Sequence, residues 1–257
     1  MRSLDGHILI TGAAGGIGRA LAQRFASSQT RLTLADQTIS SLSDLPRVLP
    51  GQVRSVDVDL ADLGAADRML AQAEAQFGPV DVLVNNAGIQ YVCHTTSVTH
   101  EEEQRIAFVN WMTPARLMRA VLPAMLRNRA GLIVNVSSIA GVIGVPWMFH
   151  YSSTKAALGV ASEILRLELR GSGVHVLTVY PGSIATPMGA RSKQIYDNPL
   201  VDRSPTASPE DLAEVVYRAA KESKPRVVYP QVYKFHWYLR GLMTWFTWAT
   251  APRPKHI

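Results

Sequence analysis

The sequence predicts a single α/β domain built on a doubly wound parallel sheet with helices on both faces. Three observations lead to this fold class. Short apolar runs alternate with helical segments, and right-handed crossovers between parallel strands place such helices on both sides of one sheet. The runs are apolar almost without interruption, which is typical of strands buried on both faces. With 257 residues, 47% of them hydrophobic, the chain can bury one sizeable core.

The elements follow one another in a regular order. The first strand, Gly6–Thr11, ends in glycines, and Gly16–Ser27 then places Ile17, Leu21 and Phe25 on one helical face. Similar patterns predict helices at Ala61–Phe77 and Tyr151–Arg170, and strands at Arg31–Asp36, Gln52–Asp57, Val80–Asn85, Gly131–Ser137, Val174–Tyr180 and Arg226–Tyr229.

The charges divide the chain into a neutral body and a basic tail. The formal net charge is +6, yet no acidic residue follows Glu222, whereas six basic residues do. We assign residues 1–230 to the domain and residues 231–257 to an aromatic and basic C-terminal extension. A nucleic-acid-binding protein more often spreads its basic surface over the folded domain, so we expect no nucleic-acid partner.

Cysteine and histidine usage limits the chemistry. The single cysteine, Cys93, excludes an internal disulfide and a cysteine-only zinc site. His94 and His100 lack a carboxylate at ligand spacing, so no metal site is predicted. The N-terminal residues lack the apolar region of a signal peptide, and no uncharged run approaches the roughly 20 apolar residues of a spanning helix. We expect a cytoplasmic protein.

A glycine-rich turn with the pattern Thr-Gly-x-x-x-Gly-x-Gly follows the first strand and opens a helix. Glycine lets a pyrophosphate approach the backbone closely, and a helix N-terminus offers free N–H groups. A dinucleotide is therefore expected here, although a strand–helix turn without a ligand gives the same pattern. The residues of this turn that we assign to the cofactor are Gly12, Gly15, Gly16, Ile17 and Gly18.

Asp36 ends the second strand, eighteen residues after Gly18. A carboxylate there can accept hydrogen bonds from both hydroxyls of an adenosine ribose, and it would repel a 2′-phosphate. No lysine or arginine stands at residues 13–15 or directly after Asp36. The sequence therefore favours NAD over NADP, the alternative being an aspartate that only closes a turn.

Tyr151 and Lys155 are four residues apart on a predicted helix and share one helical face. An ammonium beside a phenol favours the phenolate, so we expect the pKa of Tyr151 to lie below its usual value of about 10 and to suit acid–base catalysis. Ser137 and Ser138 end the preceding strand, at the edge of a doubly wound sheet where ligands bind. A serine hydroxyl there can bind a substrate carbonyl.

Over about residues 5–229 these motifs resemble the short-chain dehydrogenase/reductase family. The resemblance implies a Rossmann fold with strand order 3-2-1-4-5-6-7, hydride transfer between nicotinamide and an alcohol or carbonyl, and a homodimer or homotetramer. The matching residues are Thr11-Gly12, Gly16-Ile17-Gly18, Asn85-Asn86-Ala87-Gly88, Asn110, Ser138, Tyr151-x-x-x-Lys155 and Pro181-Gly182.

The resemblance also implies catalytic roles. Tyr151 would exchange a proton with the substrate oxygen, Lys155 would bind the nicotinamide ribose, and Ser138 rather than Ser137 would orient the substrate oxygen. Asn110 resembles the residue that holds a water in a proton relay to the lysine. Its alternative role is that of an asparagine inside a helix, bonded to backbone.

Further matches concern the cofactor. Asp59, with Asp57 as its rival, resembles the acidic residue that meets the adenine amino group. Residues 181–186 resemble the nicotinamide loop, in which the Ile184 backbone and the Thr186 hydroxyl would meet the carboxamide. The full cofactor set is Gly12, Gly15, Gly16, Ile17, Gly18, Asp36, Asp59, Asn86, Ala87, Gly88, Tyr151, Lys155, Pro181, Gly182, Ile184 and Thr186.

The substrate side is expected from residues 90–96, from residues 139–149 and from a mobile lid at about residues 186–208. The second segment is largely apolar. We therefore predict an NAD-dependent dehydrogenase or reductase of a lipophilic secondary alcohol or ketone, steroid-like or fatty-acyl-derived. One alternative is an NADPH-dependent 3-oxoacyl thioester reductase, against which Asp36 argues. The other is a catalytically silent nucleotide-binding module, against which the intact catalytic set argues.

The C-terminal extension holds three of the five tryptophans, between Val232 and Trp248. If it is helical, aromatic residues occupy all of its faces, and burial on one side would leave some exposed. One interpretation is an interfacial helix on an anionic membrane, which would make the protein membrane-associated. The other is an oligomer contact or a cover over the substrate pocket, because the segment lacks a strongly charged face.

Overall fold

A seven-stranded parallel sheet forms the centre of the computed structural model, which describes residues 4–196 and 203–250. The sheet order is β3-β2-β1-β4-β5-β6-β9, which confirms the predicted order. All neighbouring strands are parallel. The strands are β1 (Gly6–Thr11), β2 (Thr30–Asp36), β3 (Gln52–Asp57), β4 (Val82–Asn85), β5 (Gly131–Val136), β6 (Val174–Pro181) and β9 (Arg226–Tyr229).

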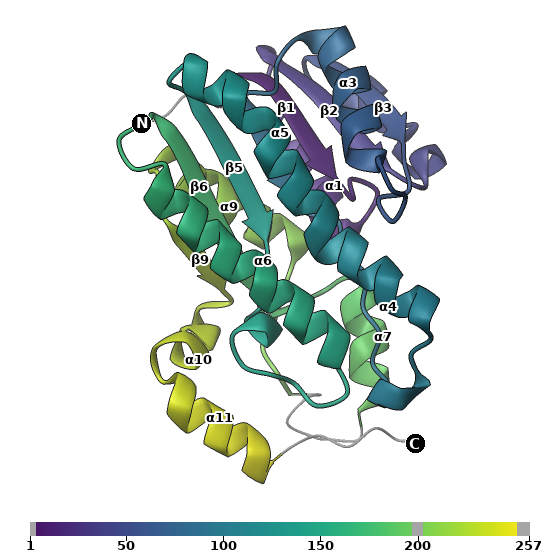
Figure 1. Ribbon diagram of the computed structural model, residues 1–257, viewed down its shortest axis with the longest axis vertical. Coiled ribbons are helices and arrows are strands. Elements are labelled where there is room, and N and C mark those ends of the chain that lie inside the picture. The colour runs from purple at the N-terminus through teal and green to yellow at the C-terminus, as the bar shows by residue number, and fades with distance from the viewer. Residues whose placement is uncertain (1–3, 197–202, 251–257) are drawn as a thin grey trace.

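Helices cover both faces of this sheet, as predicted (Figure 1). One face carries α1 (Gly16–Phe25) and α9 (Pro209–Lys221), and the other carries α3 (Ala65–Phe77), α5 (Thr113–Arg127) and α6 (Phe149–Glu168). Each face has its own apolar cluster, with Leu21 and Leu212 in one and Met69, Leu117 and Leu158 in the other. Burying one such side chain contributes about 1.5–3 kcal/mol, so the two clusters hold the layers together.

Local capping explains where several helices begin. The Thr99 hydroxyl accepts from Glu102 N at 3.2 Å and the Glu102 carboxylate accepts from Thr99 N at 2.9 Å, a capping box that starts α4 (His100–Ala107). The Ser208 hydroxyl accepts from Asp211 N at 3.0 Å and starts α9. The apolar periodicity did not predict α4 or α9, although their cap residues stand in the sequence. It also did not predict α5, which has no side-chain cap. Short helices η1 (Ile39–Leu42) and α2 (Leu45–Val48) precede β3.

The carboxyl ends of the strands carry the remaining short elements. A π-helical turn, η3 (Phe108–Met112), connects α4 to α5. In the predicted lid, α7 (Pro187–Ile195) lies between β7 (Ser183–Ile184) and β8 (Thr206–Ala207), which pair in parallel. Residues 197–202 of that lid lie outside the described residues. Short 3-10 helices η2 (Thr95–Ser97) and η4 (Ile139–Gly141) lie in the other two predicted substrate segments.

The C-terminal extension folds as η5 (Gln231–Tyr233), α10 (Lys234–Tyr238) and α11 (Arg240–Ala249). It lies beyond the carboxyl ends of β6 and β9, in yellow in Figure 1. Among the described residues, no helix is both long and apolar enough to cross a membrane. The last seven residues of the extension, 251–257, are outside the described part of the chain.

Candidate active site

A cavity of about 830 Å³ lies at the carboxyl ends of the strands. It is lined by nearly all residues that the sequence assigns to cofactor or catalysis. Of that set, Asn110 and Asp59 are not among the lining residues. Those that line the cavity are Gly12, Gly15, Gly16, Ile17, Gly18, Asp36, Asn86, Ala87, Gly88, Ser138, Tyr151, Lys155, Pro181, Gly182, Ile184 and Thr186.

The glycine-rich turn has two kinds of glycine. A Cβ on Gly12 would lie 2.6 Å from Ala87 Cα, and one on Gly18 would lie 2.1 Å from the Gly12 carbonyl oxygen, so both pack against backbone. A Cβ on Gly15 would instead meet only the Gly12 carbonyl oxygen, at the ordinary contact distance of 3.4 Å, so this second kind of glycine is not closely packed. Helix α1 starts at this turn without a side-chain cap. Its free N–H groups at the cavity wall form a donor set that fits a pyrophosphate.

Asp36 lies at the cavity wall next to the glycine-rich turn. Its Oδ2 accepts from Ala14 N at 2.9 Å and its Oδ1 accepts from Thr38 N at 3.0 Å. Each carboxylate oxygen keeps a lone pair for a further donor. The two cations among the described lining residues, Lys155 and Lys193, come from α6 and α7 rather than from this turn. The residues present therefore fit an adenosine ribose with free hydroxyls.

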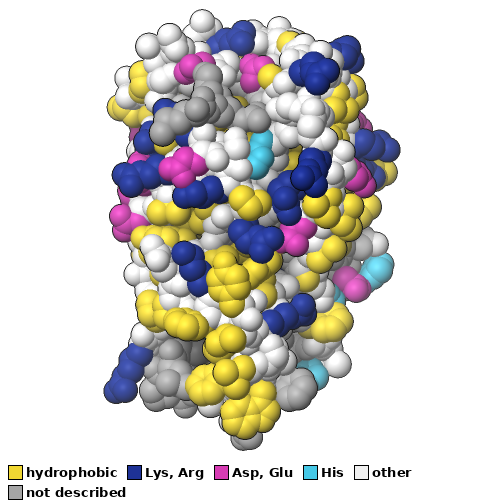
Figure 2. Space-filling model, turned by 90° about the vertical axis from the view of Figure 1, so that its left-hand side faces the viewer, with side chains coloured by type: hydrophobic (Ala, Val, Ile, Leu, Met, Phe, Trp, Pro, Cys, Tyr) yellow, Lys and Arg dark blue, Asp and Glu magenta, His cyan; other side chains and the backbone are white. Residues whose placement is uncertain are grey.

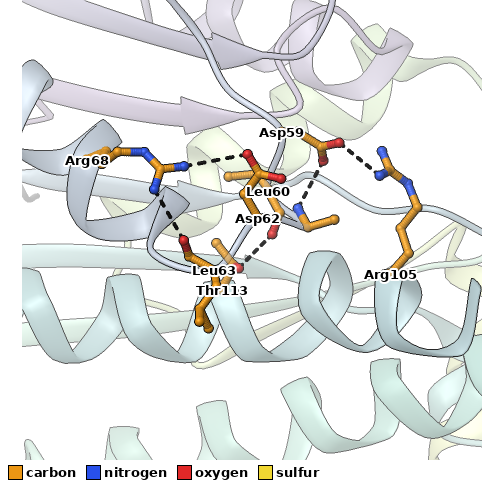
Figure 3. A network of polar contacts seen from close by, with 8 residues as sticks. Asp59, Leu60, Asp62, Leu63, Arg68, Arg105 and Thr113 are labelled. Carbon is orange, nitrogen blue, oxygen red and sulfur yellow. Dashed lines mark hydrogen bonds and ion pairs between the residues drawn. The ribbon is translucent and has the colours of Figure 1, made fainter. Parts of the chain in front are cut away.

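Asp59 belongs to a polar network beside the cavity (Figure 3). Its Oδ2 accepts from Arg105 Nη1 at 2.8 Å and its Oδ1 accepts from Ala61 N at 3.0 Å. Burial pushes the pKa of Asp59 upward, but the two hydrogen bonds hold this pKa below its ordinary value. Arg105 also donates to Gln37 Oε1 at 3.0 Å. Sequence reasoning missed Arg105, which stands 46 residues after Asp59 with no spacing signal. The adenine contact of Asp59 stays a prediction.

Ser138, Tyr151 and Lys155 come together where β5 meets α6. The Ser138 hydroxyl accepts from Ala140 N at 3.1 Å, and it lies close enough to the phenol of Tyr151 to oppose the rise in the pKa of that phenol. The Ser137 hydroxyl instead donates to the backbone oxygen of Lys155 at 2.7 Å. Ser138 is therefore the serine beside the phenol, the arrangement that the resemblance implies.

Burial dominates the ionisation of both titratable groups. It raises the pKa of Tyr151, against an opposing hydrogen bond from Ser138, and it lowers the pKa of Lys155 to about 8. The expectation of a lowered Tyr151 pKa is therefore wrong, because loss of hydration disfavours the charged form of each group. Lys155 Nζ donates to the Val136 carbonyl oxygen at 2.8 Å. The lysine is thus held at the end of β5.

Asn110 stands on the π-helical turn η3, a kind of bulge found mostly at functional sites. Its Oδ1 accepts from Ile89 N at 2.9 Å, and its Nδ2 donates to the Ile89 oxygen at 3.0 Å and to the Thr154 hydroxyl at 3.1 Å. A Cβ on Gly88 would lie 3.1 Å from Lys155 Nζ and 3.5 Å from Asn110 Oδ1. Both polar groups therefore converge on Gly88, although the bonds of Asn110 are also those of a structural residue.

The substrate side of the cavity combines predicted and unpredicted segments. Of residues 90–96 only Gln90 lines it, whereas four lining residues come from the predicted apolar segment: Ile139, Ala140, Val145 and Met148. The C-terminal extension adds a further wall, which agrees with the interpretation of this segment as a cover over the substrate pocket. The residues of the extension that line the cavity are Tyr233, His236, Met243, Phe246, Thr247 and Thr250. The last four are three, one and three residues apart, as on one face of a helix, and this spacing is the signal by which the sequence could have predicted the wall.

Comparisons with known proteins agree with this geometry. The family model described as short chain dehydrogenase matches residues 6–196. The chain is 30% identical over 230 residues to dehydrogenase/reductase SDR family member 7B of Mus musculus, covering 84% of this chain and 71% of the relative. It is 36% identical over 189 residues to 2-(R)-hydroxypropyl-CoM dehydrogenase of Xanthobacter autotrophicus, covering 70% and 75%.

Two solved structures are similar over most of their length. A short-chain dehydrogenase from Sphingobium yanoikuyae in complex with NADPH has a TM-score of 0.80 and 25% identity, covering 94% of this chain and 95% of that one. A 3-ketoacyl-(acyl-carrier-protein) reductase from Brucella melitensis complexed with NADH has a TM-score of 0.77 and 25% identity, covering 88% and 98%. With the observed strand order, these likenesses confirm the Rossmann fold.

Proposed function

Because this chain belongs to the short-chain dehydrogenase family, we propose that it is an NAD-dependent oxidoreductase that interconverts a lipophilic secondary alcohol and its ketone. The observation that carries the proposal is one cavity that contains Asp36 beside the uncapped start of α1 and Tyr151 beside Ser138. The cofactor end and the acid–base end of the reaction are thus joined. The nicotinamide supplies or accepts the hydride when the cofactor is bound.

Each catalytic side chain has a stated task. In reduction, the Tyr151 phenol gives its proton to the substrate oxygen while the Ser138 hydroxyl orients that oxygen. Because burial raises the pKa of Tyr151, the phenol is protonated at neutral pH and prepared for this step. In oxidation the phenol must first lose its proton. The Lys155 ammonium, present below a pKa of about 8, favours that loss and binds the ribose hydroxyls.

The preference for NAD rests on the charges around Asp36. Arg19 reaches the same wall through Ser41, to whose oxygen it donates at 3.0 Å, but its guanidinium is ion-paired with Asp44. The carboxylate of Asp36 therefore faces the ribose without a free cation from the residues described around it. A 2′-phosphate would meet repulsion there.

The cofactor proposal is tested by kcat/KM for NADH and NADPH with one ketone. The wild type is expected to favour NADH, and Asp36→Ser to shift the ratio toward NADPH by at least about tenfold, the equivalent of ~1.4 kcal/mol of removed repulsion. Asp62→Asn is the matched control, because Asp62 pairs with Arg68 on the surface. A wild type that favours NADPH would contradict the proposal.

A lipophilic substrate is supported by the apolar side chains on the substrate side, among them Val145, Met148 and Phe246. The likeness to the Brucella melitensis reductase favours a second candidate, reduction of a 3-oxoacyl thioester. A panel of steroid-like ketones, long-chain ketones and 3-oxoacyl thioesters with NADH separates the two. Turnover of the thioesters alone would replace the first candidate, and no turnover at all would leave a silent nucleotide-binding module.

We propose that α6 forms the contact of a homodimer or homotetramer. Val160, Ile164 and Leu167 are exposed by 61%, 52% and 62% at positions that share one face of this helix. An apolar stripe of this kind is typical of an oligomer face. Light scattering should show a smaller species for Ile164→Arg and an unchanged one for Leu63→Arg, which alters an exposed leucine elsewhere.

We propose that the outward face of the extension contacts an anionic membrane surface. Tyr238, Leu242 and Trp245 are exposed by 75%, 58% and 62%, with the cations Lys234 and Arg240 beside them in sequence. Figure 2 shows apolar side chains gathered at this end of the molecule, with basic side chains above them. The wild type should sediment with phosphatidylserine vesicles, and a Leu242→Ser/Trp245→Ser variant should not. If that variant instead caused the subunits to dissociate, the outward face of the extension would be a contact with a second copy of this chain.

The expectation of a cytoplasmic protein stays a prediction.

A further inference from the structure

The C-terminal extension is fastened to the body at two points. The Trp237 ring lies 4.7 Å from the Tyr180 ring, and the Arg226 guanidinium lies 4.5 Å from the centre of the Trp237 ring. Tyr233 packs so closely on the backbone of Gly182 that a Cβ there would lie 2.3 Å from its ring. Because Gly182 belongs to the predicted nicotinamide loop, the start of the extension is held directly beside that loop.

His236 lies between these two points, on α10, and its side chain lines the cavity. Its ring centre is 5.3 Å from that of Tyr233, so one aromatic ring separates it from the nicotinamide loop. Met243 and Phe246 of α11 line the same cavity. The histidine is therefore a polar side chain in a largely apolar part of the wall.

The polar atoms of His236 are incompletely satisfied. Its Nδ1 is buried and has no hydrogen-bond partner among the described residues. Burial also lowers the pKa of His236, which favours the neutral ring. A proton on Nδ1 would bury an unpaired donor, so we expect the proton on Nε2. Nε2 also has no hydrogen-bond partner among the described residues, but it is not one of the buried polar atoms, so its N–H is accessible to a ligand in the cavity.

We propose that His236 is a specificity-determining residue that donates its Nε2–H to a second oxygen of the substrate, away from the reacting carbon. The substrate class is then a lipophilic ketone or alcohol that carries another carbonyl or hydroxyl group. The apolar side chains around the histidine hold the hydrocarbon, and Tyr151 acts on the reacting oxygen at the other end. This inference rests on the proposed alcohol–ketone function.

A site built to hydrogen-bond a substrate oxygen discriminates against the analogue that lacks it, because the partner group of the site is then left unpaired. A bond worth about 1.4 kcal/mol corresponds to a tenfold preference. The matching test offers cyclic or long-chain ketones in pairs with NADH. One member carries a second oxygen several carbons from the reacting ketone, and the other carries hydrogen there.

The wild type is expected to favour the oxygenated member by at least about tenfold in kcat/KM. His236→Phe should remove this preference by weakening only the oxygenated member, while His236→Gln, which keeps an N–H donor, should retain part of it. His100→Phe is the matched control, because His100 is exposed on α4. Equal loss for both members of the pair, or no preference in the wild type, overturns the proposal.

A second measurement separates this inference from the proposed function. Nitrogen-15 NMR of the ligand-free protein, assigned with His236→Phe, reports which ring nitrogen carries the proton. A proton on Nε2 is expected, and a proton on Nδ1 overturns the assigned donor whatever the enzyme turns over. A wild type that reduces no ketone of the panel overturns the proposed function instead.

Discussion

Asn110 holds both backbone polar groups of Ile89: its Oδ1 accepts the N–H at 2.9 Å and its Nδ2 donates to the carbonyl oxygen at 3.0 Å. Through this pair the π-helical turn η3 fixes the segment after β4, in which Gly88 lines the cavity. A side chain that the resemblance assigns to a proton relay thus also determines where the backbone of the cofactor site lies.

These two hydrogen bonds between Asn110 and the Ile89 backbone predict that loss of the Asn110 amide lowers the stability of the fold. Asn110→Leu leaves the half-buried backbone groups of Ile89 without their side-chain partners, and each unsatisfied group costs about 1–3 kcal/mol. We expect the free energy of unfolding, measured with urea and without cofactor, to fall by roughly 2–4 kcal/mol. Asn128→Leu is the control, because Asn128 is exposed at the end of α5. Equal stabilities of the two variants would show that the Asn110 bonds do not hold the segment.

Gly88 gives a second prediction. The Cβ of Gly88→Ala would lie 3.1 Å from Lys155 Nζ, the flexible end of a side chain, so the lysine can yield by a few tenths of an ångström. We expect stability to change by less than about 1 kcal/mol, because this substitution creates no core cavity and buries no unpaired polar group. The displaced ammonium should nevertheless lower kcat/KM at least about tenfold.

Gly144→Ala is the matched control for that variant, because a Cβ on Gly144 meets nothing within 4 Å. Steady-state kinetics and thermal unfolding of the two variants check the prediction. Wild-type activity in Gly88→Ala would contradict the position assigned to Lys155.

The lysine itself predicts a pH dependence of stability. Burial lowers the pKa of Lys155 from 10.5 to about 8, so above pH 8 the folded chain has released a proton that the unfolded chain still holds. The stability contribution of this group is therefore full above pH 10.5 and is lost as the pH falls through about 8. Relative to Lys155→Met, the wild type should gain roughly 2 kcal/mol between pH 8 and 9.5, at 1.36 kcal/mol for each pH unit. The free energies of unfolding of both proteins are measured in urea across this pH range. If the difference between them did not change with pH, this pKa of Lys155 would be contradicted.

The parts of the fold that follow from local sequence were predictable. Apolar runs located the central strands such as β4 and β5, which are buried along their whole length. The edge strand β3 was predicted from a shorter pattern, and only Val53 and Val56 of it are buried. Helices α4 and α9 were not predicted, because their caps are polar signals that an apolar periodicity does not register. The boundaries of α3 and α6 differ by a few residues from those expected, since helix ends depend on local capping.

The parts of the site that depend on contacts between distant segments were not predictable. Nothing in the spacing connects Asp59 with Arg105, or Gly182 with Tyr233. The pKa of Tyr151 was expected to fall, because the sequence shows the neighbouring lysine but not the burial that raises this pKa. Short motifs fix residue types, whereas burial and long-range partners set their chemistry.

The most direct test of the acid–base assignment compares Tyr151→Phe with the wild type in two assays, NADH binding by fluorescence and ketone-dependent oxidation of NADH. Tyr217→Phe is the control, because Tyr217 packs on Phe25 on the α1 and α9 side of the sheet. We expect Tyr151→Phe to bind NADH as the wild type does and to lose at least about 100-fold in turnover, the loss of one acid–base group. Turnover within threefold of wild type would contradict the role of this phenol.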